Sequence, residues 1–241
     1  MTYIVQGSAT QLHWLQQRLD RRGLPALADA DGAPSWLPAD WQGFYLPSDS
    51  WLNVDADHQA ALPPRLRHCQ THGVALLELD GAWQALGRDF GFMLLLGAEQ
   101  TPSAAAAALL DALAPLPAAW LCCGPVGSAR YTRQVWDALL FMLRQHAPPS
   151  PDTPIALDWE NTLRRQWQLW EKLLQLSLRY LEQHGLEVDA ASARQAFAEA
   201  PRRQHHYAAS LARLIIASGG CQQAWQQLWG SLAAHAAAAP N

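Results

Sequence analysis

Hydrophobic and polar positions follow two different patterns along this chain of 241 residues. In the first half, short apolar runs are interrupted by glycine, proline or acidic residues, which is typical of strands. The run from Phe92 to Leu96 is nearly all apolar, as in a strand that is buried on both faces. We expect strands over residues 3–6, 24–28, 44–46, 74–79, 92–96 and 120–123.

Helical spacing separates these predicted strands. Leu12, Leu15 and Leu19 recur at steps of three and four residues, with Thr10 as a predicted N-cap. Two further helices are predicted over residues 59–72 and 103–114. Strands that alternate with helices predict an α/β fold.

No strand pattern follows residue 123. Helices are predicted over residues 129–145, 159–184, 189–200 and 221–238, with another that ends at Ser218. The second of these helices carries a stripe of Trp and Leu from Trp159 to Leu181, which favours a core or a dimer interface. We therefore expect an α/β Rossmann-like domain over residues 1–127, followed by an all-α helical domain over residues 128–241.

Composition and charge exclude several classes of function. Half of the residues are apolar (50%), and the net charge is −4, which argues against nucleic-acid binding. No apolar run reaches the roughly 18 residues that a membrane span needs. The first residues contain no basic leader and no long apolar core, so we expect a cytoplasmic protein.

The four cysteines, Cys69, Cys122, Cys123 and Cys221, form no CxxC pair and have no metal-like spacing with histidine. We interpret them as free thiols in a reducing compartment, and we expect no metal site.

The N-terminal segment has the order of a dinucleotide-binding βαβ unit: strand, glycine turn, helix, strand and acid. Only Gly7 remains of the G-x-G-x-x-G fingerprint, because the segment reads QGSATQ. A side chain at the second glycine position keeps the backbone away from a pyrophosphate. Gly7 and Asp29 are therefore weak candidate cofactor residues, with Asp31 as the other candidate acid for a ribose hydroxyl.

Two segments carry a resemblance to a known family. Residues 124–137, GPVGSARYTRQVWD, resemble the CGPxGxGHxVKMVHN segment of 6-phosphogluconate dehydrogenases, and residues 87–97, GRDFGFMLLLG, look like that family's GxExGxxLMxGG. The resemblance implies a Rossmann domain, a helical domain that dimerises, and oxidative decarboxylation of a sugar acid with NADP.

The family's chemical residues are changed in this chain. The catalytic lysine of the family falls on Arg133, and arginine, with a pKa above about 12, cannot shuttle a proton near neutral pH. The family's asparagine falls on Asp137, its histidine on Trp136, and its proton-donating glutamate on Leu140. Arg133 and Asp137 are thus positional equivalents of catalytic residues, and we expect them to be inactive.

Two groups of polar residues allow alternative interpretations. Arg130, Arg133 and Asp137 form either a remodelled anion pocket at a helix start or a solvated face with an Arg–Asp pair. His205 and His206 are either a base or ligand, or surface and interface residues. Adjacent residues point about 100° apart on a helix, so they make a poor chelating pair.

Our leading hypothesis is a degenerate 6-phosphogluconate-dehydrogenase-like protein without dehydrogenase activity, which acts as a binding or partner protein. We expect no cofactor, and we expect a homodimer or a complex with a partner enzyme through the helical domain. The alternative is an NAD(P)-dependent oxidoreductase with a changed substrate, which would bind NADP or NAD.

Overall fold

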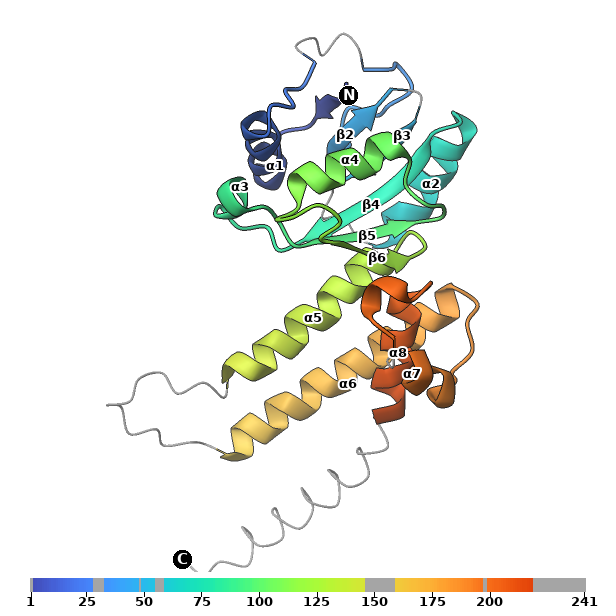
Figure 1. Cartoon of the computed structure of the whole chain (residues 1–241). Coiled ribbons are helices and arrows are strands. Elements are labelled where there is room, and N and C mark those ends of the chain that lie inside the picture. Colours follow the sequence, from blue (N-terminus) through green and yellow to red (C-terminus); the bar gives the residue numbers. More distant parts are fainter. Residues whose placement is uncertain are drawn as a thin grey trace, which may run out of the picture. The chain divides into compact units, whose positions relative to one another are not determined.

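The computed structural model describes residues 2–27, 33–47, 49–54, 59–145, 159–196 and 199–218 (Figure 1). The chain divides into two compact units. The first contains the residues up to Trp136 together with Pro201–Ala208, and the second contains Asp137–Ala200 and the residues from Ala209 onward. The predicted domain boundary after residue 127 stays a prediction, since compactness alone divides the chain after Trp136.

One sheet organises the first unit. Its six strands are β1 (Ile4–Gln6), β2 (Gly43–Leu46), β3 (Ser50–Asn53), β4 (Ala75–Gly81), β5 (Leu94–Ala98) and β6 (Trp120–Gly124), and they lie side by side in sequence order. The β3–β4 and β5–β6 pairs are parallel, and the other three pairs are antiparallel. The sheet is therefore mixed.

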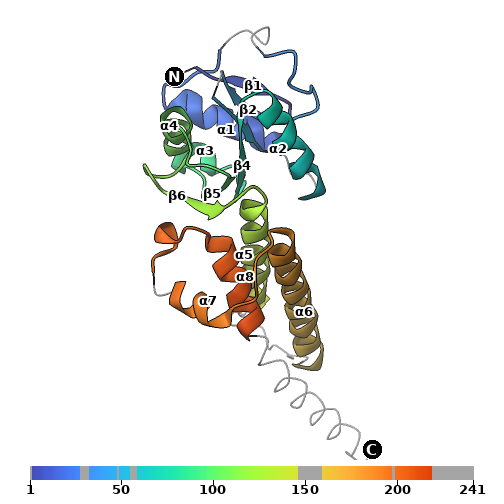
Figure 2. The ribbon, with the colours of Figure 1, turned by 90° about the vertical axis from the view of Figure 1, so that its right-hand side faces the viewer.

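Helices are interleaved with the strands and cover both faces of the sheet. They are α1 (Thr10–Arg21), α2 (Leu62–Thr71) after the short η2 (Gln59–Ala61), α3 (Gly87–Phe90) and α4 (Ala104–Leu113). Figure 2 shows α2 on one side of the strands and α1 with α4 on the other. The α/β class, with strands and helices alternating as in Rossmann-like folds, is confirmed.

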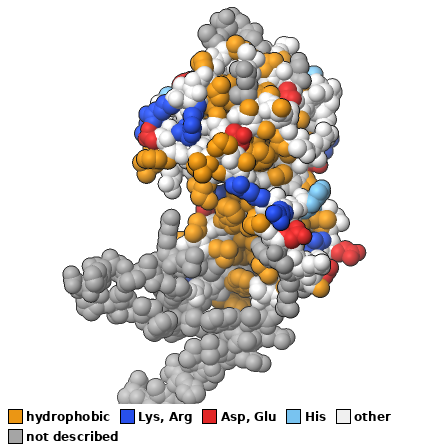
Figure 3. All heavy atoms as spheres, in the orientation of Figure 1, with side chains coloured by type: hydrophobic (Ala, Val, Ile, Leu, Met, Phe, Trp, Pro, Cys, Tyr) orange, Lys and Arg blue, Asp and Glu red, His pale blue; other side chains and the backbone are white. Residues whose placement is uncertain are grey.

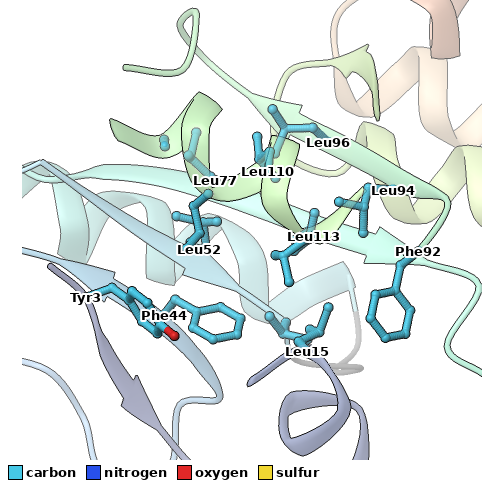
Figure 4. Close-up of a cluster of buried hydrophobic side chains, with 14 of the residues drawn as sticks. Tyr3, Leu15, Phe44, Leu52, Leu77, Phe92, Leu94, Leu96, Leu110 and Leu113 are labelled. Atoms are coloured by element: carbon cyan, nitrogen blue, oxygen red, sulfur yellow. The ribbon is translucent and has the colours of Figure 1, made fainter. Parts of the chain in front are cut away.

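Alternation along the strands fills the two faces with different side chains. In β2, Phe44 and Leu46 pack with Leu15 of α1 and Leu110 of α4, in the core cluster drawn in Figure 4. The intervening Tyr45 faces the opposite cluster, which contains Trp51 and residues of α2. This period of two is what a sheet covered on both faces requires.

The predicted βαβ unit at the N-terminus is wrong. Residues 24–27 form no strand, although the Leu27 N–H donates to the Tyr3 carbonyl over 3.0 Å. Pro25 lacks an N–H group, which disfavours a ladder at this point. The next strand after α1 is β2, which runs antiparallel to β1. Strand β3 and helix α3 were not predicted.

The C-terminal part is helical over the residues that the structure describes. Its elements are α5 (Ser128–Gln145), α6 (Trp159–Gln183), α7 (Ala190–Ala196), η3 (Pro201–Arg203) and α8 (Tyr207–Ser218). The buried side of α6 contains Leu173, Ser177, Tyr180 and Leu181. Of the predicted stripe, Leu181 is therefore buried as expected, whereas Leu178 is 37% exposed. The helix predicted over residues 221–238 lies outside the described residues. No helix within the described ranges combines the length and apolarity that crossing a bilayer requires.

Candidate functional site

The turn between β6 and α5 is the strand-to-helix turn that the sequence marks most strongly. Gly124 and Gly127 have φ angles of +135° and +100°, which L side chains rarely adopt. Because the first N–H groups of a helix have no partner inside the helix, the start of α5 needs acceptors. In phosphate-binding folds a bound anion fills this position.

The side chain of Glu78 supplies these acceptors from within the sheet. Its Oε2 accepts from the N–H groups of Gly127 over 2.6 Å and Ala129 over 3.2 Å, and its Oε1 accepts from Arg130 over 3.1 Å. Glu78 lies in the middle of β4 and is 4% exposed. The start of α5 is thus capped by an internal carboxyl group.

Neighbouring residues fit around this cap. Glu99 Oε1 accepts from the N–H group of Val126 over 3.1 Å. A Cβ atom at Gly97 would collide with the Glu78 carboxyl group and lie 2.9 Å from the carbonyl oxygen of Pro125. Gly97 therefore leaves the space that the Glu78 side chain occupies.

Burial dominates the electrostatics of Glu78. It raises the pKa of this carboxyl group to about 7, an effect that Asp80 reinforces, while the N–H groups of Gly127, Arg130 and Ala129 oppose it. A carboxyl group that titrates near neutral pH is often found at an active site. Since Glu78 is buried and bonded to three backbone donors, it positions the turn rather than facing a substrate.

His206 and Ser128 fill the space beside Gly124. A Cβ atom at Gly124 would collide with the His206 ring, approaching its Nε2 to 2.7 Å, and would lie 2.9 Å from Ser128 Oγ. Ser128 is fully buried, and His206 is half-buried, whereas His205 is exposed. The two histidines therefore have different surroundings, and only His206 packs against the turn.

The structure places the predicted site residues along α5. The backbone of Arg130 belongs to the Glu78 cap, the side chain of Arg133 is half-buried, and that of Asp137 is exposed. The anion pocket predicted for this helix start does not have its backbone donors available, because Glu78 accepts from them. The interpretation as a remodelled anion pocket is therefore not the one that the geometry favours.

The turn at Gly7 is also filled by a side chain of the chain itself. Gln42 Oε1 accepts from the N–H groups of Ser8 over 2.7 Å and Ala9 over 3.0 Å, directly before α1. A Cβ atom at Gly7, whose φ is +102°, would collide with the Gln42 amide. Thus Gln42 occupies the position that a pyrophosphate would take in a dinucleotide-binding turn. Asp29 and Asp31 lie outside the described residues.

A pocket of about 440 Å³ lies at the starts of β3 and β4. Asp49 and Glu99 line it, together with Ser103 at the start of α4. Ser103 Oγ accepts from the N–H group of Ala106 over 3.1 Å and donates to Asp49 Oδ2 over 2.6 Å. The described residues that line the pocket include no Lys, Arg or His, so the pocket offers no cationic side chain to an anion.

Two of the three described cysteines are buried away from solvent. Cys69 and Cys123 are buried free thiols, and burial raises the pKa of Cys69 to about 12 and that of Cys123 further still. Within the described residues, no three His, Cys, Asp or Glu side chains come together as metal ligands would.

Sequence reasoning missed the two side chains that fill the turns. The sequence does distinguish Glu78, because it is the only charged residue in the predicted strand from Val74 to Leu79. A charge at such a position needs a partner in the fold. Nothing in the sequence distinguishes Gln42, since a glutamine in an irregular segment looks the same whether its side chain is solvated or bonded within the fold.

No protein-family model matches the chain, and no curated protein matches it significantly in sequence. The fold and the site therefore define the class of this protein only as an α/β chain with a helical C-terminal part.

Proposed function

We propose that this chain is a non-catalytic binding or partner protein of the cytoplasm, without dehydrogenase activity. The observation that supports the proposal is the filling of both glycine turns: Gln42 accepts from the donors near Gly7, and Glu78 accepts from those of α5. Hydride transfer with a nicotinamide cofactor requires a site for its pyrophosphate, and both turns are occupied.

The form of the sheet supports the same proposal. Dinucleotides bind at the carboxyl ends of a mostly parallel sheet, where the strand order reverses. Here the strand order follows the sequence, and only two of the five strand pairs are parallel. Descent from the 6-phosphogluconate dehydrogenase family remains a hypothesis, and the proposed function does not depend on it.

We also propose that the helical part contributes to pairing, as a homodimer or with a partner enzyme. In the second unit, Leu178 and Val188 are 37% and 55% exposed, which gives this part apolar surface. Sedimentation velocity of the whole chain and of the L178E variant tests this proposal. A wild-type dimer that L178E weakens supports pairing. A chain that sediments as a monomer, and that forms no complex with an enzyme purified alongside it, contradicts the proposal.

Calorimetry and absorbance at the nicotinamide band test the proposed lack of activity. We expect no binding of NADP, NADPH or NAD, and no reduction of NADP in the presence of 6-phosphogluconate or other sugar acids. Turnover that is lost in R133A but kept in Q134A, an exposed neighbour on the same helix, would overturn the proposal in favour of an oxidoreductase with a changed substrate.

A further inference from the structure

Four large apolar side chains are exposed at the α3 corner of the first unit. Leu86, Phe90, Met93 and Leu116 are 64%, 72%, 59% and 68% exposed. Figure 3 shows hydrophobic side chains gathered at the position of α3, next to Lys and Arg side chains. Single exposed apolar residues are common on proteins, but a cluster marks an interaction surface. We call these four residues the α3 patch.

Two adjoining turns hold the patch together. The backbone N–H of Phe92 donates to the Leu113 carbonyl over 3.0 Å, which joins the segment after α3 to the end of α4. Gly91, with a φ of +91°, lies so close to the backbone of Ala114 and Pro115 that a Cβ atom would collide with it. Leu116 is therefore kept beside the residues of α3.

The buried side chain of Arg18 joins these two turns by hydrogen bonds to their backbone. Arg18 of α1 is 5% exposed and donates to the carbonyl oxygens of Asp89 over 2.7 Å, Ala112 over 3.2 Å and Ala114 over 3.3 Å. The ring of Phe92, which is 1% exposed, packs against Gly87 at the start of α3. Because the backbone under the patch is fixed in advance, little further ordering is needed when a partner binds.

The edge of the patch is positively charged. At the surface, the end of α1 and the start of α3 carry Arg21, Arg22 and Arg88 against Asp20 and Asp89, a local balance of +1 in a chain with a net charge of −4. Arg21 pairs with Asp89, and Arg88 donates to the Ala85 carbonyl over 2.8 Å. Such an edge attracts acidic groups and disfavours basic ones.

We propose that the α3 patch docks an acidic amphipathic segment of a partner protein, with two or three large apolar side chains flanked by Asp or Glu. The apolar side chains of the segment cover Leu86, Phe90, Met93 and Leu116, and its carboxylates face the arginines of α1 and α3. The inference rests on the proposed role as a binding protein and names the chemistry of the partner.

The local charge favours this occupant over the alternatives. A second copy would bring the same arginines against one another across a two-fold axis, which costs free energy unless other contacts compensate. An anionic membrane has the right charge, but the chain as a whole is acidic and is repelled by such a surface.

Peptide display against the whole protein tests the proposal. A library of random 16-residue peptides is selected on the wild type, with the F90S variant used to remove peptides that bind elsewhere. We expect enriched sequences with apolar residues at helical spacing and an excess of Asp and Glu. Failure to enrich any sequence, or enrichment of basic peptides, would overturn the proposal.

Variants then locate the binding site of an enriched peptide. F90S and L116S should each weaken binding about tenfold or more, as truncation of a central apolar contact does. R88E should weaken binding about fivefold and reduce its dependence on salt concentration. L27S removes an apolar side chain that is 44% exposed and lies outside the α3 patch, and it should leave the affinity unchanged. Equal affinity for the wild type and F90S would contradict the proposal.

Two further measurements decide between occupants. A dimer in sedimentation velocity that F90S dissociates would assign the patch to a second copy, and co-sedimentation with phosphatidylserine vesicles that F90S abolishes would assign it to a membrane; either result overturns the proposal. Turnover of NADP would overturn the proposed function without affecting the peptide result, so the two can fail separately.

Discussion

Two strand-to-helix turns of the first unit, at Gly7 and at Gly127, have their backbone N–H groups satisfied by different side chains. At Gly7, a neutral amide from Gln42 meets two N–H groups near the surface. At Gly127, the carboxyl group of Glu78, buried in the central strand β4, meets three. Loss of the Gln42 amide should cost little free energy, because water can take its place at N–H groups near the surface. Water cannot take the place of the buried Glu78 carboxyl group, so the stability of the fold depends on this side chain.

The largest expected effect comes from removing the carboxyl group at the second turn. E78A leaves the N–H groups of Gly127, Ala129 and Arg130, of which the first two are buried, without their acceptor and opens a cavity, so we expect the free energy of unfolding to fall by about 3–5 kcal/mol. Chemical denaturation followed by tryptophan fluorescence measures the loss. A decrease no greater than that of Q42A would contradict the difference between the two turns.

The same carboxyl group should make stability depend on pH. The pKa of Glu78 is about 7 in the folded chain and 4.5 for the ordinary group, so between these values the folded state keeps a proton that the unfolded state has released. The contribution of this group to the free energy of unfolding is complete below pH 4.5 and is lost as the pH rises through 7. The total loss is up to about 3 kcal/mol.

E78Q removes this titration and isolates it from that of other groups. The stability of the wild type minus that of E78Q should shrink as the pH is raised from 5 to 8, when both proteins are unfolded by urea in matched buffers. A difference that grows with pH would mean that the backbone donors outweigh burial and lower the pKa of Glu78.

A smaller effect is expected from filling the space next to Glu78. G97A places a methyl group against the Glu78 carboxyl group and the Pro125 carbonyl oxygen. We expect a loss of about 1–3 kcal/mol, as overpacking of a buried site costs. G73A serves as a comparison, since a Cβ atom at Gly73 meets no atom within 4 Å and only the positive φ of +66° is strained. Thermal unfolding of both variants measures the difference, and equal losses would show that the contact with Glu78 is unimportant.

The smallest effect is expected at the first turn. Q42A removes a cap from the exposed N–H group of Ser8 and the partly buried N–H group of Ala9, and it should cost about 0.5–1 kcal/mol in urea unfolding. We expect that the variant gains no affinity for NADPH in calorimetry, because the second glycine of the fingerprint is still absent. Micromolar binding of NADPH by Q42A would show that Gln42 alone blocks a cofactor site.

The predicted elements succeeded where the pattern of apolar residues is local. Leu12, Leu15 and Leu19 all face the core from α1, and the apolar run after Phe92 forms β5. The run around Leu24 failed as a strand, because pairing depends on partners that are distant in the sequence, and because Pro25 cannot donate to a ladder. On α6, Leu181 of the predicted stripe is buried but Leu178 is 37% exposed, and Leu173 and Tyr180 beside the stripe are buried, since small shifts in a helix change which side faces inward.

By itself, the sequence determined the α/β character of the first part, the helical character of the second, and the glycine turn before α5, because local spacing and backbone conformation encode these features. Only the tertiary structure decided that the sheet is mixed, that Gln42 and Glu78 fill the two turns, and that Arg18 holds the α3 patch in place. The hydrogen bonds of Gln42, Glu78 and Arg18 join residues at least 33 positions apart, and no local pattern specifies such a partner.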